Sequence, residues 1–156
     1  ILKRKFISSG SSIEIKSFMN QFIDNQNGTI TDSLSGLIWS KQDSWQKDEK
    51  WVTWDEAMEF ARYLGDLKLG GLKDWRLPTI EEAKTLYDSD QINQDKYGEA
   101  ICLNTVFPSG SLGNVWINEI GSGNEGYFLN LKTGEIGRKF KSVAGRMAAR
   151  PVSKER

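Results

Sequence analysis

The residues best suited to chemistry in this 156-residue chain are basic side chains towards its C-terminal end, where residues 130–156 hold eight lysines and arginines against two glutamates. In an extended segment alternate residues share a face, so Arg146 and Arg150 would point the same way. Lys139 and Lys141 would do the same on the neighbouring segment. Such a cluster could bind several sulfates or phosphates of a polyanion, with a strong dependence on salt. The alternative is that these cations pair with carboxylates of residues 21–129, which hold 9 basic and 18 acidic side chains.

The composition argues against catalysis. The chain has no His, which removes the commonest general base and the commonest metal ligand. Its single cysteine, Cys102, excludes an internal disulfide, a four-cysteine zinc site and CxxC redox chemistry. Carboxylates are plentiful, but nothing in their spacing singles out a catalytic pair. We therefore predict that the chain is not an enzyme and that it needs no cofactor.

One turn superficially resembles a calcium-binding loop through its oxygen-rich side chains, Asp24, Asn25, Asn27 and Asp32. In the calcium-loop register, Gly28 would put Ile23 at the first ligand position, and Ile23 has no oxygen on its side chain. Turn formation explains these residues better, so we predict no metal site.

Tryptophan is abundant, with six in the chain, and three of these cluster with lysines between residues 41 and 54. Indoles stack on sugar rings and lysines pair with sulfates, so Trp45, Trp51 and Trp54 form a second candidate glycan platform. Acidic residues interleave there, and packing of at least two of the three rings is the favoured alternative. No recognition helix indicates nucleic acid, and no apolar run approaches the roughly 18 residues of a membrane span.

The elements that must position these residues read as an α+β domain. Capping boxes, Thr53 with Glu56 and Thr79 with Glu82, predict a helix over 54–66 and a short one after 79. Alternation and turn residues predict the strands, at 22–24, 29–31, 37–39, 114–118, 126–131, 135–138 and 144–152. Residues 88–113 read as a long loop. The predicted boundaries are an extension or linker at 1–21, the domain at 22–152 and a tail at 153–156.

Several segments together resemble the Lcl C-terminal domain family. The resemblance rests on the hairpin at 22–32, on Gly36-Leu37-Ile38-Trp39, on Trp54-Asp55-Glu56-Ala57 and above all on Asp74-Trp75-Arg76-Leu77-Pro78-Thr79. It implies a C-type-lectin-like fold, with two helices packed on a twisted antiparallel sheet and long irregular loops. It also implies a bacterial envelope or secreted protein with an extracytoplasmic location, which would be the periplasm, the cell surface or the outside of the cell. The resemblance also implies a pair of cysteines that joins the first helix to the last strand, as in many members of the family. This pair is missing here.

The family's best-known member is an adhesin that binds sulfated glycosaminoglycans and assembles as a trimer. The resemblance therefore implies a non-catalytic adhesion module that binds polyanionic glycans without calcium, and it allows a homotrimer. The candidate ligand-binding residues are the four basic ones above, with Trp116 and Asn118 of the predicted strand at 114–118. Loop residues between 88 and 126 are also expected to contact the ligand. The alternatives are a protein-interaction or assembly module, including a ligand-display domain, and a purely structural cap. Within the family signature, we interpret Asp74, Trp75, Arg76 and Pro78 as a packing device, the alternative being a ligand-facing cluster.

Overall fold

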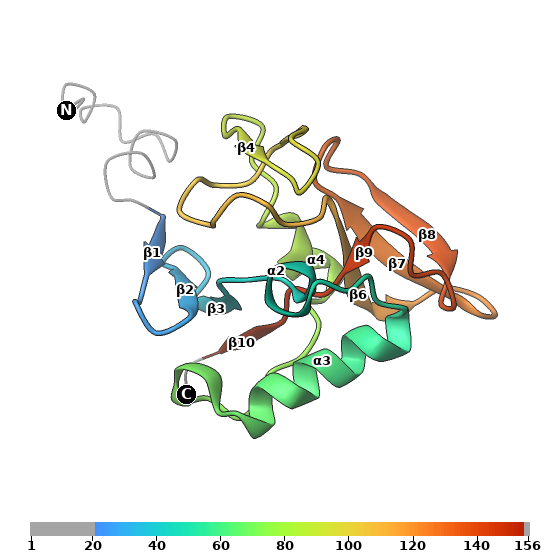
Figure 1. Cartoon of the computed structure of the whole chain (residues 1–156), viewed down its shortest axis with the longest axis horizontal. Helices are drawn as coiled ribbons and strands as arrows, with labels where there is room; N and C mark the ends of the chain where they lie inside the picture. The colour runs from blue at the N-terminus through green and yellow to red at the C-terminus, as the bar shows by residue number, and fades with distance from the viewer. Residues whose placement is uncertain (1–20, 155–156) are drawn as a thin grey trace.

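The computed structural model describes residues 21–154 and gives them an α+β architecture built on two four-stranded sheets (Figure 1). The predicted extension at 1–21 lies outside the described residues except for Gln21. The first sheet has the order β1-β2-β3-β10 and is antiparallel throughout; its strands are β1 (Phe22–Asp24), β2 (Thr29–Asp32), β3 (Leu37–Ser40) and β10 (Val152–Lys154).

The second sheet has the order β8-β7-β6-β9 and is mixed, because β9 runs parallel to β6. Its strands are β6 (Asn114–Ile120), β7 (Glu125–Asn130), β8 (Ile136–Phe140) and β9 (Met147–Ala148). A two-stranded ribbon of β4 (Asn93–Gln94) and β5 (Ala100–Ile101) lies within the segment that the sequence predicts as a loop. Figure 1 shows this segment along the upper edge of the molecule, opposite the longest helix.

Each of the three α-helices described begins at a capping box. They are α2 (Ser44–Asp48), α3 (Trp54–Asp66) and α4 (Ile80–Lys84), and a 3-10 turn, η2 (Leu69–Gly71), follows α3. The predicted helix at 54–66 and the short helix after Thr79 are confirmed. The predicted number of two is wrong, because α2 is a further helix, capped by Asp43 and Gln46 in the same way. The capping box of α2 is visible in the sequence, but a helix of this length is too short to show a periodic pattern of apolar residues.

The oxygen-rich turn belongs to the β1–β2 hairpin, and its side chains bond within the first sheet. Asp24 accepts from the backbone N–H of Gln26 at 2.8 Å and pairs with Lys41 at 2.8 Å. Gln26 and Gly28 both have positive φ, which is the conformation that a tight turn here requires. The hairpin prediction is confirmed.

The apolar core consists of two clusters. One fills the space between the first sheet, α4 and β6–β7, with Trp39, Leu103 and Phe107 among its members. The other joins α3 to β6 and β9, with Phe60 and Trp116 among its members. Trp39 and Trp116 are both fully buried. Full burial of an indole stabilises a fold through a large contact area, so these two residues fix how the layers meet.

The end of the chain differs from the single strand predicted at 144–152. Arg146 has a φ of 61°, in the left-handed region, so the alternation of a strand cannot run through it. β9 then pairs with β6 of the second sheet, whereas β10 pairs with β3 of the first. The chain therefore crosses between sheets at Ala149–Pro151, and Ser153, which we placed in a tail, is buried in β10.

Trp75, Arg76 and Pro78 of the signature segment contact other parts of the fold. Trp75 is buried, and its Nε1 donates to the carbonyl of Leu69 at 3.2 Å. The backbone of Arg76 exchanges two hydrogen bonds with Val152 in β10, which joins the signature to the first sheet. Pro78 is buried, and its carbonyl accepts from the backbone N–H of Asn118 in β6 at 2.7 Å. Asp74, at the start of the segment, is exposed.

Arg76 and Glu82 form a two-pronged ion pair, with Nη–Oε distances of 2.6 and 2.9 Å. The hydrogen bond from Arg76 is the largest cause that lowers the pKa of Glu82, which also accepts from the backbone N–H of Thr79. A lowered carboxyl pKa stabilises the fold above the ordinary pKa of the group, and that contribution is lost as the pH falls through the folded-state pKa.

We predict that Glu82→Gln lowers the free energy of unfolding by about 1–2 kcal/mol near neutral pH, through the lost charge-assisted hydrogen bonds. Urea unfolding at about pH 7 and about pH 3 should show a smaller difference between variant and wild type in acid. Glu81→Gln, at the exposed neighbouring position, is the matched control and should change little. A loss of the same size at both pH values would contradict the ion-pair explanation.

Candidate functional site

Arg150 does not lie on the surface with Arg146, so the prediction that the two share a face is wrong. Its exposed fraction is 1%, whereas Arg146 is exposed. Nη1 of Arg150 donates to the carbonyls of Ser40 and Lys41 at 2.9 and 2.6 Å, and its guanidinium carbon lies 4.8 Å from the ring centroid of Phe107. The break in the strand at Arg146 turns the next arginine into the interior. Arg150 therefore joins β3 to the loop that contains Phe107.

Asp43 is the counter-charge of Arg150 in the interior. Its carboxylate accepts from the backbone N–H groups of Gln46 and Leu112 at 2.9 and 2.8 Å. Burial raises the pKa of Asp43, and the positive charge of Arg150 opposes that shift. Burial lowers the pKa of Arg150, and Asp43 opposes that shift in turn. Both groups are buried, hydrogen-bond to the backbone and interact through their opposite charges, so they belong to the interior of the fold and not to a binding surface.

Trp116 and Asn118 also differ from their predicted role. Trp116 has an exposed fraction of 0%, and its Nε1 donates to the carbonyl of Val52 at 2.9 Å. It is a core residue that connects β6 to the start of α3, and no face of its ring is available to a ligand. Asn118 is half-buried, next to the exposed end of β6. Trp116 packs in the cluster that joins α3 to β6, and the backbone N–H of Asn118 donates to the carbonyl of Pro78.

Lys139 and Lys141, which belong to β8 and the turn after it, lie over aromatic rings. The Nζ of Lys141 is 4.2 Å from the ring centroid of Trp54, and that of Lys139 is 5.6 Å from the ring centroid of Phe128. The indole of Trp54 is itself fixed, because its Nε1 donates to the carbonyl of Ile117 at 2.8 Å. We call these two lysines and their rings the β8 strip.

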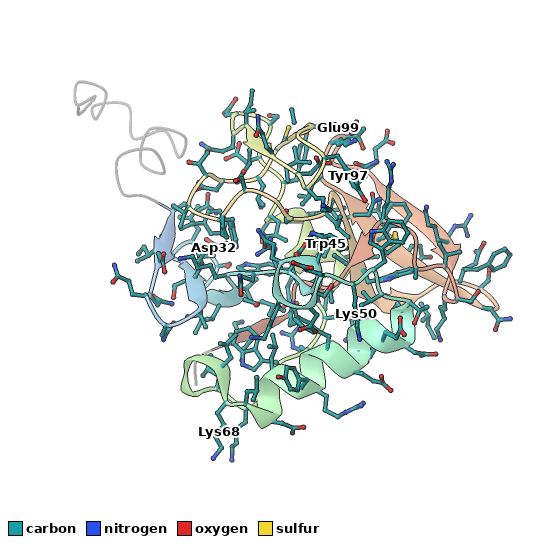
Figure 2. The ribbon with its side chains drawn as sticks, in the orientation of Figure 1. Asp32, Trp45, Lys50, Lys68, Tyr97 and Glu99 are labelled. Carbon is teal, nitrogen blue, oxygen red and sulfur yellow. The ribbon has the colours of Figure 1, made fainter. Side chains whose placement is uncertain are left out.

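A second group, which we call the cation–aromatic row, consists of Trp45, Lys96, Tyr97 and Arg146. The Nζ of Lys96 lies 4.8 Å from the ring centroid of Trp45 and 5.8 Å from that of Tyr97. The guanidinium carbon of Arg146 lies 4.5 Å from the ring centroid of Tyr97. Trp45 belongs to α2 and Tyr97 to the loop at 88–113 (Figure 2), so the row joins three separate segments of the chain.

A hollow of about 120 Å³ adjoins the row and is lined by Tyr97, Arg146, Lys132 and the amides of Asn114 and Asn130, among others. Tyr97 is 40% exposed, so part of its ring faces solvent. The hollow thus offers an aromatic surface, two cations and two amides. Such groups can stack on a sugar ring, bind an anionic substituent and hydrogen-bond to hydroxyls.

The carboxylates of Asp95 and Glu99, around the hollow, already have hydrogen-bond or ion-pair partners within the chain. Asp95 is buried, and its Oδ1 accepts from the backbone N–H groups of Tyr97 and Glu99, both at 2.8 Å. Glu99 forms an ion pair with Lys132. The hydrogen bond from Lys132 is the largest cause that lowers the pKa of Glu99, and the charge of Arg146 adds to it. Asp95 therefore fixes the position of Tyr97, while Glu99 competes with an incoming anion for Lys132.

Sequence reasoning missed Trp45, Lys96 and Tyr97 as companions of Arg146. The available signal is a basic and an aromatic residue side by side at 96–97, next to Gly98, within the region between 88 and 126 where we expect ligand contacts. Among the described residues, no group of three or more Asp, Glu or Cys side chains is close enough to hold a metal ion. In the same part of the chain, every helix is too short or too polar to cross a bilayer.

The comparison with known families decides the assignment. The family model described as the Lcl C-terminal domain matches residues 28–153. The chain belongs to the Lcl C-terminal domain family. No curated protein and no solved structure matches it. The matched range runs from just before β2 into β10 and includes the Asp74–Pro78 signature, so the Lcl C-terminal domain here comprises most of both sheets and all the described helices.

Proposed function

We propose that this Lcl C-terminal domain is a non-catalytic adhesion module that binds a polyanionic, sulfated glycan without calcium. The observation that carries the proposal is the cation–aromatic row, in which Arg146 and Lys96 lie 4.5 and 5.8 Å from the ring centroid of Tyr97, a residue that is 40% exposed. The bound groups would be sulfates or carboxylates on the cations and a sugar face on the ring. Attraction between fixed cations and an anionic polymer requires no bridging metal ion.

The wider setting of the proposal follows from the family. We propose a C-type-lectin-like fold, for which the α+β order and the long loop at 88–113 give support. We also propose an extracytoplasmic location at the bacterial envelope or beyond it. If the domain forms a homotrimer, three weak sites would bind one polymer with an avidity well above the affinity of a single site.

The test is retention on immobilised heparin, eluted with increasing salt. We expect salt-sensitive retention of the wild type, and a clear fall in the eluting salt concentration for the double variant Lys96→Ala/Arg146→Ala. The double variant Lys139→Ala/Lys141→Ala removes the same charge from the β8 strip and shows whether that strip contributes. Arg150 is not varied here, because it is buried and its loss would affect the fold.

Two results would overturn the proposal. Flow-through of the wild type at low salt would exclude polyanion binding as its function. Equal retention of the wild type and the Lys96→Ala/Arg146→Ala variant would show that the cation–aromatic row is not the binding site. Glu99→Gln supplies a test in the opposite direction, since it releases Lys132 from its ion pair and should strengthen retention.

A further inference from the structure

A second concave surface lies between α2 and α3, and we call it the α2–α3 groove. Its volume is about 520 Å³, and its lining includes Trp51, Phe60 and Tyr63. Trp51 and Tyr63 are 45% and 46% exposed, whereas Phe60 is buried beneath them at 6%. Two large, half-exposed aromatic side chains in one groove are typical of an interaction surface.

The charge of the groove is opposite to that of the cation–aromatic row. Three carboxylates line it, those of Asp48, Glu56 and Glu59, against the single ammonium of Lys50. Glu59 and Tyr63 are four positions apart on α3, so the carboxylate and the ring share one helix face. Glu56 accepts from the backbone N–H of Thr53 through Oε1, which fixes its side chain at the rim. The groove thus presents acidic groups beside aromatic rings.

Four other partly exposed aromatic side chains provide a contrast. Trp45, Trp54, Phe128 and Tyr97 each have a lysine or arginine of this chain over the ring. Within residues 21–154, no such cation lies over Trp51 or Tyr63, although both rings lie beside carboxylates that would hold one. A cation over an aromatic ring is favourable, and more so when it is partly desolvated. The groove therefore presents aromatic rings and carboxylates that could bind a cation, whereas the four other rings already have a cation of this chain over them.

We propose that the α2–α3 groove binds a segment of a partner polypeptide that carries lysine or arginine side chains. The charged head of such a side chain would lie against Trp51, Tyr63 and the carboxylate of Glu59. Its aliphatic stem would pack on the apolar floor formed by Phe60 and Val52, as long basic side chains do on apolar surfaces. A sulfated glycan is repelled by this groove, so the site is separate from the glycan site proposed above.

The probe is a short peptide of alternating lysine and glycine, compared with the same peptide after acetylation of every lysine. We expect calorimetry on the whole chain to show binding of the first peptide and loss of binding for the acetylated one. Trp51→Ala and Glu59→Gln should each weaken binding by about tenfold, and Trp51→Phe should restore part of the loss because it keeps an aromatic face. The exposure of Trp51 and Glu59 leaves the packing of α3 intact in these variants.

Glu135→Gln is the matched control, since it removes one exposed carboxylate from the β7–β8 hairpin, away from the groove. It should leave the affinity unchanged. Equal binding of the two peptides would overturn the proposal, and so would wild-type affinity in Trp51→Ala. An equal loss in Glu59→Gln and Glu135→Gln would also overturn it, because that result would show general attraction to an acidic surface. None of these three results depends on whether heparin binds.

Discussion

Replacement of Arg150 by methionine should lower the free energy of unfolding by about 3–5 kcal/mol, because it leaves the carboxylate of Asp43 buried without its counter-charge. The methionine fills much of the space over Phe107, so lost volume contributes little. The variant also loses the hydrogen bonds from Nη1 to the carbonyls of Ser40 and Lys41. Urea unfolding followed by circular dichroism measures the change. Arg146→Met, at an exposed position, is the control and should differ from the wild type by less than about 1 kcal/mol.

The pH dependence of this effect separates charge from packing. Burial raises the pKa of Asp43, and removal of Arg150 takes away the main opposing influence. A carboxyl group with a raised folded-state pKa destabilises the fold above that pKa, and the penalty disappears as the pH falls and the group takes up a proton. The difference between Arg150→Met and the wild type should therefore shrink in mild acid. A difference that stays constant with pH would show that packing, and not the buried charge, explains the loss.

Truncation of Trp116 to alanine should lower the free energy of unfolding by about 3–5 kcal/mol, as expected when a large buried aromatic side chain is removed. The indole is fully buried between β6 and α3, and its absence also leaves the carbonyl of Val52 without a donor. Thermal and urea unfolding measure the change.

Trp116→Phe is the informative control for that substitution. It keeps an aromatic ring in the core but cannot donate to Val52, so its loss should be smaller and close to that of one buried hydrogen bond with some packing, about 1–3 kcal/mol. Folded Trp116→Phe should bind heparin as the wild type does, because the ring lies in the core. If Trp116→Phe lost heparin binding while its stability stayed unchanged, that result would show that Trp116 does contribute to the ligand-binding site.

Local signals explain which parts of the fold could be predicted. The capping boxes of Thr53 and Thr79 and the turn at Gly28 are set by residues within four positions of one another, and these elements form as predicted. The residue types at 146 and 150 show that both side chains are cations, but they do not show whether either is buried. Burial depends on the crossing between sheets at Ala149–Pro151, which no local pattern encodes, so Arg150 was assigned to the wrong environment.

The candidate site shows the same limit. Tyr97 and Arg146 come together because the loop at 88–113 is joined to the segment after β7, where the backbone N–H of Cys102 donates to the carbonyl of Leu131 at 2.8 Å. The bridge between Asp95 and Ser111 closes the loop on itself. The buried carboxylate of Asp95 determines the path of that loop through two backbone hydrogen bonds. The sequence could indicate that the loop carries binding residues, but their partners depend on tertiary contacts between distant segments.

The pairing of β10 with β3 has a consequence for how the domain is made. Ser40 and Arg150, which share a buried hydrogen bond, are 110 positions apart in the chain. During synthesis β3 therefore emerges long before the strand that completes its sheet, and its edge stays open for pairing with other chains in the meantime. Contacts of such long range slow folding, typically to milliseconds or seconds for domains rich in them. Completion of the domain must then follow emergence of residues 147–154 from the ribosome, and a nascent chain stalled before them should be the species most prone to aggregate.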